Sequence, residues 1–351
     1  MIDATARLEH YIDHLAPTWR ALPEHRRGRF YVPEAMVEHA ESLGIDPTPY
    51  LGSGDVPVRI GDPDPVLVAA TQDIGRVRSS MRRIVYQGHG IGQSFVMPDG
   101  LRRKGYSGGP GFDGVSLFLA TNERHAALWR EAYPRADVEV VGSPKLGGRS
   151  REDGPRDPLV VASFHWAATL AGVPEAGSAW SYYRRALPGL ARRFDFALHA
   201  HPRIRDVVEP EAERIGVPFI RSFDEVLDRA GVYVNDCSST LWEFAAFGGP
   251  VVVLNSPDFR RDVHHGLRFW DCADVGPQVD RPSGLVAAIL RAQADPEEDR
   301  LRRRAIAADL YPFDDPADRA ARAILNLAGP PESAHPQAPA LAGSSTHTPE
   351  V

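Results

Sequence analysis

Short apolar runs alternate with segments of helical periodicity along most of the chain. In the first part, strands are predicted for the runs 29–32, 65–70, 83–86, 116–121 and 138–142. A helix is predicted near the start, where Leu8, Tyr11, Ile12, Leu15 and Trp19 fall on one face, and further helices over 33–43 and 123–133. Strands that alternate with helices in this way predict a parallel, doubly wound α/β sheet.

The same alternation starts again after a polar stretch. Residues 147–157 are rich in Gly and charge and have no apolar period, so they are interpreted as a linker. Strands are predicted beyond it at 158–163, 194–198, 231–234 and 251–254, and helices at 182–193, about 283–294 and about 297–328. The Pro-, Ala-, Ser- and Thr-rich end predicts a disordered tail.

These patterns divide the chain into two α/β domains. We expect an N-terminal, acceptor-side domain over 1–146, a linker over 147–157, a C-terminal, nucleotide-binding domain over 158–328 and a tail over 329–351. Two facing domains of this kind leave a cleft lined by the carboxyl ends of their strands, which is where open parallel sheets hold ligands. The functional residues are therefore expected at those strand ends.

The stretch 235–255 carries the strongest candidate site. It predicts a strand, a polar turn with Asp236, Ser238, Ser239 and Thr240, a helix, and a second strand after Gly248-Gly249-Pro250. Unpaired backbone N–H groups and the positive end of the dipole at a helix N-terminus stabilise an anion such as a diphosphate. The alternative is a set of caps that serves the helix alone.

A second candidate lies in the loop after the strand 83–86. His89 stands between Gly88 and Gly90, so the backbone can turn sharply and the imidazole can stand clear of the sheet. A histidine there can accept a proton from an attacking hydroxyl near neutral pH. The alternatives are a turn histidine bonded to a neighbouring carbonyl, and a dinucleotide fingerprint, which is weak because its third glycine falls on Gln93.

Further histidines follow other strands. His199 and His201 alternate at a strand end and would point to one side, where two imidazoles can bind a metal. No third ligand has the expected spacing, so we predict no metal, a catalytic role for His201 in holding or protonating a phosphate oxygen, and a core or rim position for His199. His264 and His265 are adjacent and cannot both face the cleft.

Composition excludes several classes of function. The chain of 351 residues has a formal charge of −7, which argues against a nucleic-acid partner bound through a basic surface. Its two cysteines, Cys237 and Cys272, are too few for a disulfide framework and fit a reducing compartment. No apolar stretch has membrane-spanning length and the start does not resemble a signal peptide. We expect a cytoplasmic protein, with a peripheral place at the inner membrane face as one option.

Together these motifs carry a family resemblance. The Gln87-Gly88-His89-Gly90 loop, the Val141-Gly142-Ser143-Pro144 segment, His201-Pro202, the Asp236-x-Ser238-Ser239 turn and the Tyr311-Pro312-Phe313-Asp314-Asp315…Arg319 segment resemble the CDP-glycerol glycerophosphotransferases of teichoic acid synthesis, in order and spacing across most of 66–328. That resemblance implies a GT-B fold of two facing Rossmann-like domains with parallel sheets and a cleft between them. The chain is also similar to the UDP-N-acetylglucosamine 2-epimerases, which implies that Glu243 holds the nucleotide ribose.

The resemblance implies a transferase that needs no metal or other cofactor. An acceptor hydroxyl would attack the outer phosphorus of a CDP-alcohol, with His89 as the base. His201, Ser238, Ser239 and Thr240 would hold the phosphates, and Asp236 would position the turn. The expected partners are a nucleotide-activated donor and a hydroxyl acceptor, either soluble or lipid-linked. A glycosyltransferase that uses a nucleotide-diphosphate sugar is the first alternative, and a non-catalytic nucleotide-binding module is the second.

The chain departs from the family after His89-Gly90. Where those enzymes typically continue with Thr-Pro and a lysine, this chain has Ile91-Gly92-Gln93-Ser94, so a cationic phosphate contact is missing. This departure leaves the donor open between a CDP-alcohol and a nucleotide sugar. The chain also lacks the long N-terminal extension of the polymerising members, which favours a soluble acceptor or transfer of a single unit.

Overall fold

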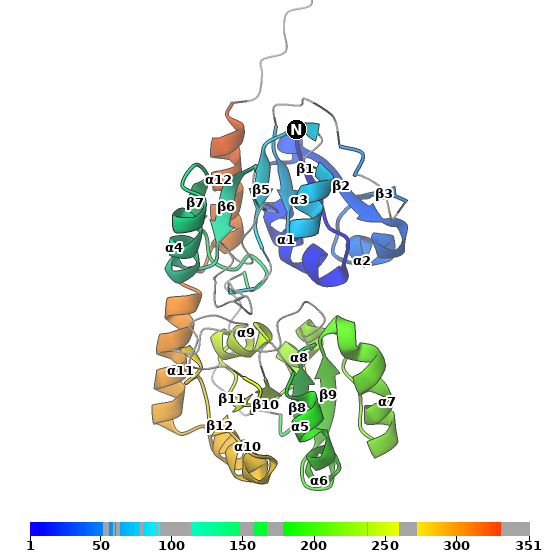
Figure 1. Ribbon diagram of the computed structural model, residues 1–351, viewed down its shortest axis with the longest axis vertical. Coiled ribbons are helices and arrows are strands. Elements are labelled where there is room, and N and C mark those ends of the chain that lie inside the picture. Colours follow the sequence, from blue (N-terminus) through cyan, green and yellow to red (C-terminus); the bar gives the residue numbers. More distant parts are fainter. Residues whose placement is uncertain are drawn as a thin grey trace, which may run out of the picture.

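The computed structural model describes residues 1–51, 56–58, 60, 64–77, 80–88, 90–91, 112, 114–147, 157–166, 178–236, 238–259 and 272–330. These residues form two α/β domains, one above the other in Figure 1, each built on its own sheet. The expected fold class, two facing domains with parallel sheets, is confirmed.

Seven parallel strands form the N-terminal sheet. Their order across the sheet is β3 (Pro47–Tyr50), β2 (Arg27–Pro33), β1 (Ile2–Thr5), β4 (Val66–Val68), β5 (Ile84–Tyr86), β6 (Val115–Ala120) and β7 (Asp137–Val140). The helices of this half are α1 (Glu9–Ala21), α2 (Val37–Ser42), α3 (Thr71–Val77) and α4 (Glu123–Ala132). The chain winds outward from β1 in one direction and then returns to its other side at β4, so the sheet has a switch point between β1 and β4.

Five parallel strands form the C-terminal sheet. Their order is β12 (Gln278–Val279), β11 (Val251–Leu254), β10 (Val232–Asn235), β8 (Val160–Phe164) and β9 (Phe196–Ala200). Its helices are α5 (Trp180–Tyr183), α6 (Leu187–Ala191), α7 (Arg205–Ile215), α8 (Phe223–Arg229), α9 (Thr240–Ala246), α10 (Leu285–Ala294) and α11 (Glu297–Leu310). Because β8 lies between β9 and β10, the switch point of this sheet lies between β8 and β10.

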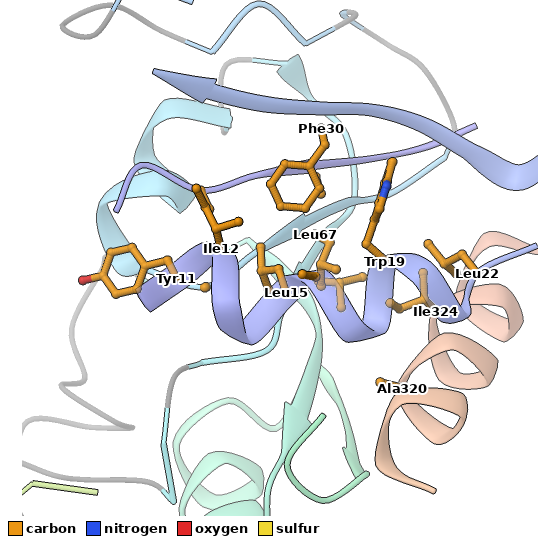
Figure 2. Close-up of a cluster of buried hydrophobic side chains, with 14 of the residues drawn as sticks. Tyr11, Ile12, Leu15, Trp19, Leu22, Phe30, Leu67, Ala320 and Ile324 are labelled. Atoms are coloured by element: carbon orange, nitrogen blue, oxygen red, sulfur yellow. The ribbon is translucent and has the colours of Figure 1, made fainter. Parts of the chain in front are cut away.

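The last helix, α12 (Pro316–Ala328), belongs to the N-terminal core. It packs on α1 and β6, and its buried side chains Ala320, Ala321 and Ile324 join the cluster around Leu15 and Leu67. Figure 2 shows Ile324 and Ala320 facing α1 below the N-terminal sheet. Assigning all of 158–328 to the second domain therefore needs correction for this helix, whose apolar face is covered by the first domain.

The expected single helix over about 297–328 is also two helices. α11 ends at Leu310, and α12 starts at Pro316 after the segment Tyr311–Asp315. Pro312 and Pro316 cause this break, since each proline disfavours a helical conformation in the residue before it. The two helices run along one side of the molecule, α11 beside the C-terminal domain and α12 beside the N-terminal domain (Figure 1).

Candidate functional site

A cavity of about 580 Å³ lies between the two domains. One wall comes from the N-terminal domain, with Glu9, His10 and Asp13 of α1 and His39 of α2. The other wall comes from the residues that follow β8, β9 and β10 and from α8 and α9. The cavity thus lies over the switch point of the C-terminal sheet, as the strand order of an open parallel sheet predicts.

The turn after β10 is held by a chain of hydrogen bonds. The Ser238 N–H donates to Asn235 Oδ1 (3.2 Å), and the Thr240 hydroxyl donates to Ser238 Oγ (2.9 Å). Thr240 Oγ1 also lies 2.9 Å from the Tyr233 hydroxyl, which accepts a bond from Asn235 Nδ2 (3.2 Å). Ser238 and Thr240 line the cavity, so their hydroxyls are presented in fixed positions.

Asp236 is buried beneath the turn and holds it in place. Its carboxylate is fully buried and accepts hydrogen bonds from the backbone N–H groups of His165 and Ala179, both at 2.9 Å, and from Ser178 Oγ at 3.3 Å. Both oxygens are therefore used to tie the chain after β8 and the start of α5 to the turn. These bonds fit the expected role of Asp236 in positioning the turn, and Asp236 is not among the residues that line the cavity.

Ser239, the N-cap residue of α9, and Glu243, one turn into that helix, meet at the cavity. Ser239 Oγ is 3.4 Å from Glu243 Oε1, and the Lys145 ammonium is 3.2 Å from Glu243 Oε2. The Glu243 side chain is only 1% exposed, and its pairing with the Lys145 ammonium offsets the free-energy cost of burying its negative charge. Sequence reasoning missed Lys145, although it directly follows the Gly142-Ser143-Pro144 segment that carries part of the family resemblance.

His201 lines the cavity at the end of β9. Its Nδ1 accepts a bond from the Arg203 N–H (3.1 Å), which places the proton of the neutral imidazole on Nε2. The ring centres of His165 and His10 are 5.0 and 5.7 Å from that of His201, and His10 comes from the opposite domain. Imidazoles from both domains thus meet at this edge of the cavity.

His199 is buried, as expected, although it also contributes to the cavity wall. Its Nδ1 lies 2.7 Å from Ser163 Oγ, and burial, together with Lys145 and Arg205, lowers the pKa of its imidazole to about 3. His199 is therefore neutral and serves as a hydrogen-bonded wall residue. Among the described residues, no group of three or more His, Cys, Asp or Glu side chains is arranged to hold a metal ion.

The glycine loop of the first domain lies against α9. Gly88 and Gly90 have φ values of +74° and +122°, and a Cβ atom on Gly90 would lie 2.9 Å from Ser239 Oγ. The Gly90 carbonyl accepts a bond from Thr121 Oγ1 (2.9 Å), and Ile91 is fully buried in the C-terminal core beside Leu241. The loop is thereby fixed to the helix that carries Ser239 and Glu243. His89, His264 and His265 lie outside the described residues.

No family model and no curated protein matches the chain, but many solved structures share its fold. The wall teichoic acid polymerase TagF with CDPG is 9% identical, with a TM-score of 0.61 over 93% of this chain and 88% of that one. The Neisseria meningitidis UDP-GlcNAc 2-epimerase bound to UDP-GlcNAc is 13% identical, with a TM-score of 0.55 over 93% and 98%.

A glycotransferase of kitacinnamycin is also similar, at 14% identity and a TM-score of 0.56 over 93% of this chain and 98% of that chain. At such low identity these likenesses establish the architecture, and the two parallel-sheet domains are those of the GT-B fold. In the described part of the chain, no helix is both long and apolar enough to cross a membrane.

Proposed function

We propose that this protein is a GT-B transferase that moves a polyol phosphate group from a CDP-alcohol donor to an acceptor hydroxyl. One observation carries the proposal. Five residues singled out in the sequence, His201, Ser238, Ser239, Thr240 and Glu243, line one wall of a single interdomain cavity. A cavity of about 580 Å³ has the size of a small-molecule site.

The wall suits a nucleotide diphosphate. The Ser238 and Ser239 hydroxyls and His201 Nε2 are hydrogen-bond donors that a phosphate oxygen can accept from, while the Thr240 hydroxyl donates to Ser238 Oγ and holds it in place. Glu243 is an acceptor for ribose hydroxyls, with Oε1 near Ser239. Two of the similar structures named above, the epimerase and TagF, hold UDP-GlcNAc and CDPG, which supports a nucleotide-linked ligand here.

In the proposed reaction, the acceptor oxygen forms a bond to the outer phosphorus of the donor. The bond from that phosphorus to the bridging oxygen breaks, and its electron pair leaves with the cytidine monophosphate. His89 takes the proton of the acceptor hydroxyl as general base. The hydroxyls and His201 stabilise the charge that gathers on the phosphate oxygens, which is where fixed donors accelerate such transfers most.

A glycosyltransferase is the second candidate. The sequence after Gly90 lacks the lysine expected in a CDP-glycerol enzyme, and the same wall can hold the diphosphate of a nucleotide sugar. In that reaction the acceptor attacks the anomeric carbon, so the nucleoside diphosphate is released. The two reactions therefore differ in the nucleotide that is released, a monophosphate in the first and a diphosphate in the second.

Analysis of the released nucleotide tests the proposal. The protein is incubated with CDP-glycerol, CDP-ribitol, UDP-glucose, UDP-GlcNAc or GDP-mannose and simple alcohol acceptors, and the products are separated by ion exchange. Release of CMP, lost in His89→Ala and His201→Ala, is expected. Release of a nucleoside diphosphate supports the glycosyltransferase, conversion of UDP-GlcNAc to its 2-epimer supports an epimerase, and binding without turnover supports the non-catalytic module. Each of these three results contradicts the CDP-alcohol proposal.

A further inference from the structure

Lys145 reaches the cavity from the segment that joins the two domains. It lies in a turn after β7, where the N–H groups of Leu146 and Gly147 donate to the Ser143 carbonyl. Its side chain is 13% exposed, and its Nζ lies 5.0 Å from the centre of the Phe223 ring in the C-terminal domain. Lysine is rare in this protein: Lys104 and Lys145 are its lysines, and arginine supplies every other basic side chain in the Lys and Arg count.

The surrounding carboxylates keep Lys145 charged. Burial alone would lower the pKa of its ammonium, but Glu243, Asp13 and Asp224 outweigh burial and raise that pKa above its usual value. The side chain therefore carries a full positive charge at neutral pH. Asp13 comes from the N-terminal domain, whereas Asp224 and Glu243 come from the C-terminal domain, so the cation lies where the two domains meet.

The ion pair with Glu243 leaves the Lys145 ammonium able to donate further hydrogen bonds to a ligand. A lysine ammonium has three N–H donors, and among the described residues Glu243 Oε2 accepts one of them. The side chain lines the cavity together with Ser239 and Thr240. A ligand oxygen can therefore bond to Lys145 while its pair with Glu243 stays intact.

We propose that Lys145 binds the diphosphate of the nucleotide donor, an inference that rests on the proposed function. The Glu243 carboxylate connects Lys145 with Ser239, since its Oε2 accepts a bond from Lys145 and its Oε1 lies beside Ser239. The fixed ammonium then lies near the charge that develops on the departing nucleotide phosphate when its bond to the transferred group breaks. Lys145 thus takes the place of the cation that the chain lacks after His89-Gly90.

A series of ligands that differ in phosphate number tests this role. Affinities of cytidine, CMP and CDP, and of the matching uridine and guanosine series, are measured by calorimetry for the unaltered protein, Lys145→Met and Lys145→Arg. The readout is the ratio of diphosphate affinity to nucleoside affinity. Because a charged hydrogen bond to phosphate is lost, that ratio should fall at least about tenfold in Lys145→Met and far less in Lys145→Arg.

The ratio separates this role from simple neutralisation of Glu243. If Lys145 only compensates that carboxylate, Lys145→Met weakens nucleoside and diphosphate binding equally. That result, or an unchanged ratio, overturns the inference and leaves the proposed function intact. If the unaltered protein binds none of the nucleotides, the proposed function fails first and this inference fails with it.

Discussion

Gly90 is a residue at which the two domains approach closely in the candidate site. Its φ of +122° favours glycine, and a Cβ atom would lie 2.9 Å from Ser239 Oγ and 3.0 Å from Ser239 Cβ. Gly44 is a useful comparison, because its φ is also positive, at +71°, but no atom lies within 4 Å of its added Cβ.

Gly90→Ala should therefore cost more than Gly44→Ala. Gly44→Ala introduces backbone strain alone, about 1–2 kcal/mol. Gly90→Ala adds to such strain a clash between the new methyl group and Ser239, which is displaced. We expect Gly90→Ala to unfold at lower urea concentration and to lose nucleotide affinity, with Gly44→Ala retaining that affinity. Equal effects of both variants on urea unfolding and on affinity would show that the contact with Ser239 does not constrain the site.

Asp73 gives the fold a pH dependence. It lies in α3, its carboxylate is fully buried, and Arg7 Nε is 3.5 Å from Oδ1. Burial raises the pKa of Asp73 from 3.8 to about 7, against the opposing effects of Arg7 and Arg76. The unfolded chain therefore releases this proton at lower pH than the folded protein, so this group lowers stability as the pH rises from about 4 to about 7.

Asp73→Asn removes that dependence. The free energy of unfolding of the variant should exceed that of the unaltered protein by an amount that grows with pH, from about 1 kcal/mol at pH 5 to about 4 kcal/mol at pH 8. Urea unfolding at pH 5, 6.5 and 8 measures the difference. A difference that stays constant across these pH values would mean that Asp73 is already ionised in the folded protein at pH 5.

Part of the cavity wall on the C-terminal domain could be predicted from local sequence. Ser238 and Ser239 follow an apolar strand and Thr240 begins the next helix, and this order alone brings them to a strand end. The positions of Lys145 and Asp236 could not be predicted this way. The partner of Lys145 is 98 residues away along the chain, and the partners of Asp236 are 57 to 71 residues away. Such pairs are created by tertiary packing, which periodicity does not encode.

At the scale of elements, the clearest omission was β1. The sequence predicted that the chain opens with a helix, whereas Ile2–Thr5 form a strand at the switch point of the N-terminal sheet. The strand could not be recognised from the sequence, because the carboxylate of Asp3 interrupts the apolar run. The structure compensates its burial with an ion pair to Arg82 and a bond from the Arg29 N–H (2.7 Å).

The packing of α12 makes the N-terminal domain depend on the end of the chain. Ile324 is fully buried in the cluster shown in Figure 2, while Leu301 on α11 is 56% exposed. Ile324→Ala should reduce the free energy of unfolding by about 2–5 kcal/mol, and Leu301→Ala should change it by less than about 0.5 kcal/mol.

Hydrogen exchange locates the effect of Ile324→Ala. Amides of α1 should exchange faster in this variant, because α12 covers α1, while amides of β10 and β11 should lose less protection. A loss of protection confined to the C-terminal sheet would contradict the assignment of α12 to the N-terminal core.

At the scale of the whole molecule, the two domains are joined by more than the connecting segment. Asn122 Nδ2 lies 3.1 Å from the Ile91 carbonyl and 3.3 Å from the Leu310 carbonyl, so the N-cap of α4 contacts both the glycine loop and the end of α11. Across the cavity, Arg205 of α7 pairs with Glu9 of α1 at 3.6 Å. These contacts explain why residues from both domains define one cavity.

The central claim is that this cavity binds a nucleotide diphosphate, and a thermal-shift panel tests it most directly. CDP-glycerol, CDP-ribitol, UDP-glucose, UDP-GlcNAc, GDP-mannose, CMP and UMP are compared on the unaltered protein, on Ser239→Ala and Glu243→Ala, and on Glu139→Gln as an exposed control. A ligand at about 100 times its dissociation constant stabilises the fold by about 2.7 kcal/mol. We predict a shift with the cytidine diphosphate donors that weakens in both cavity variants and persists in the control. No shift with any nucleotide, or a shift that both cavity variants retain in full, would contradict the claim.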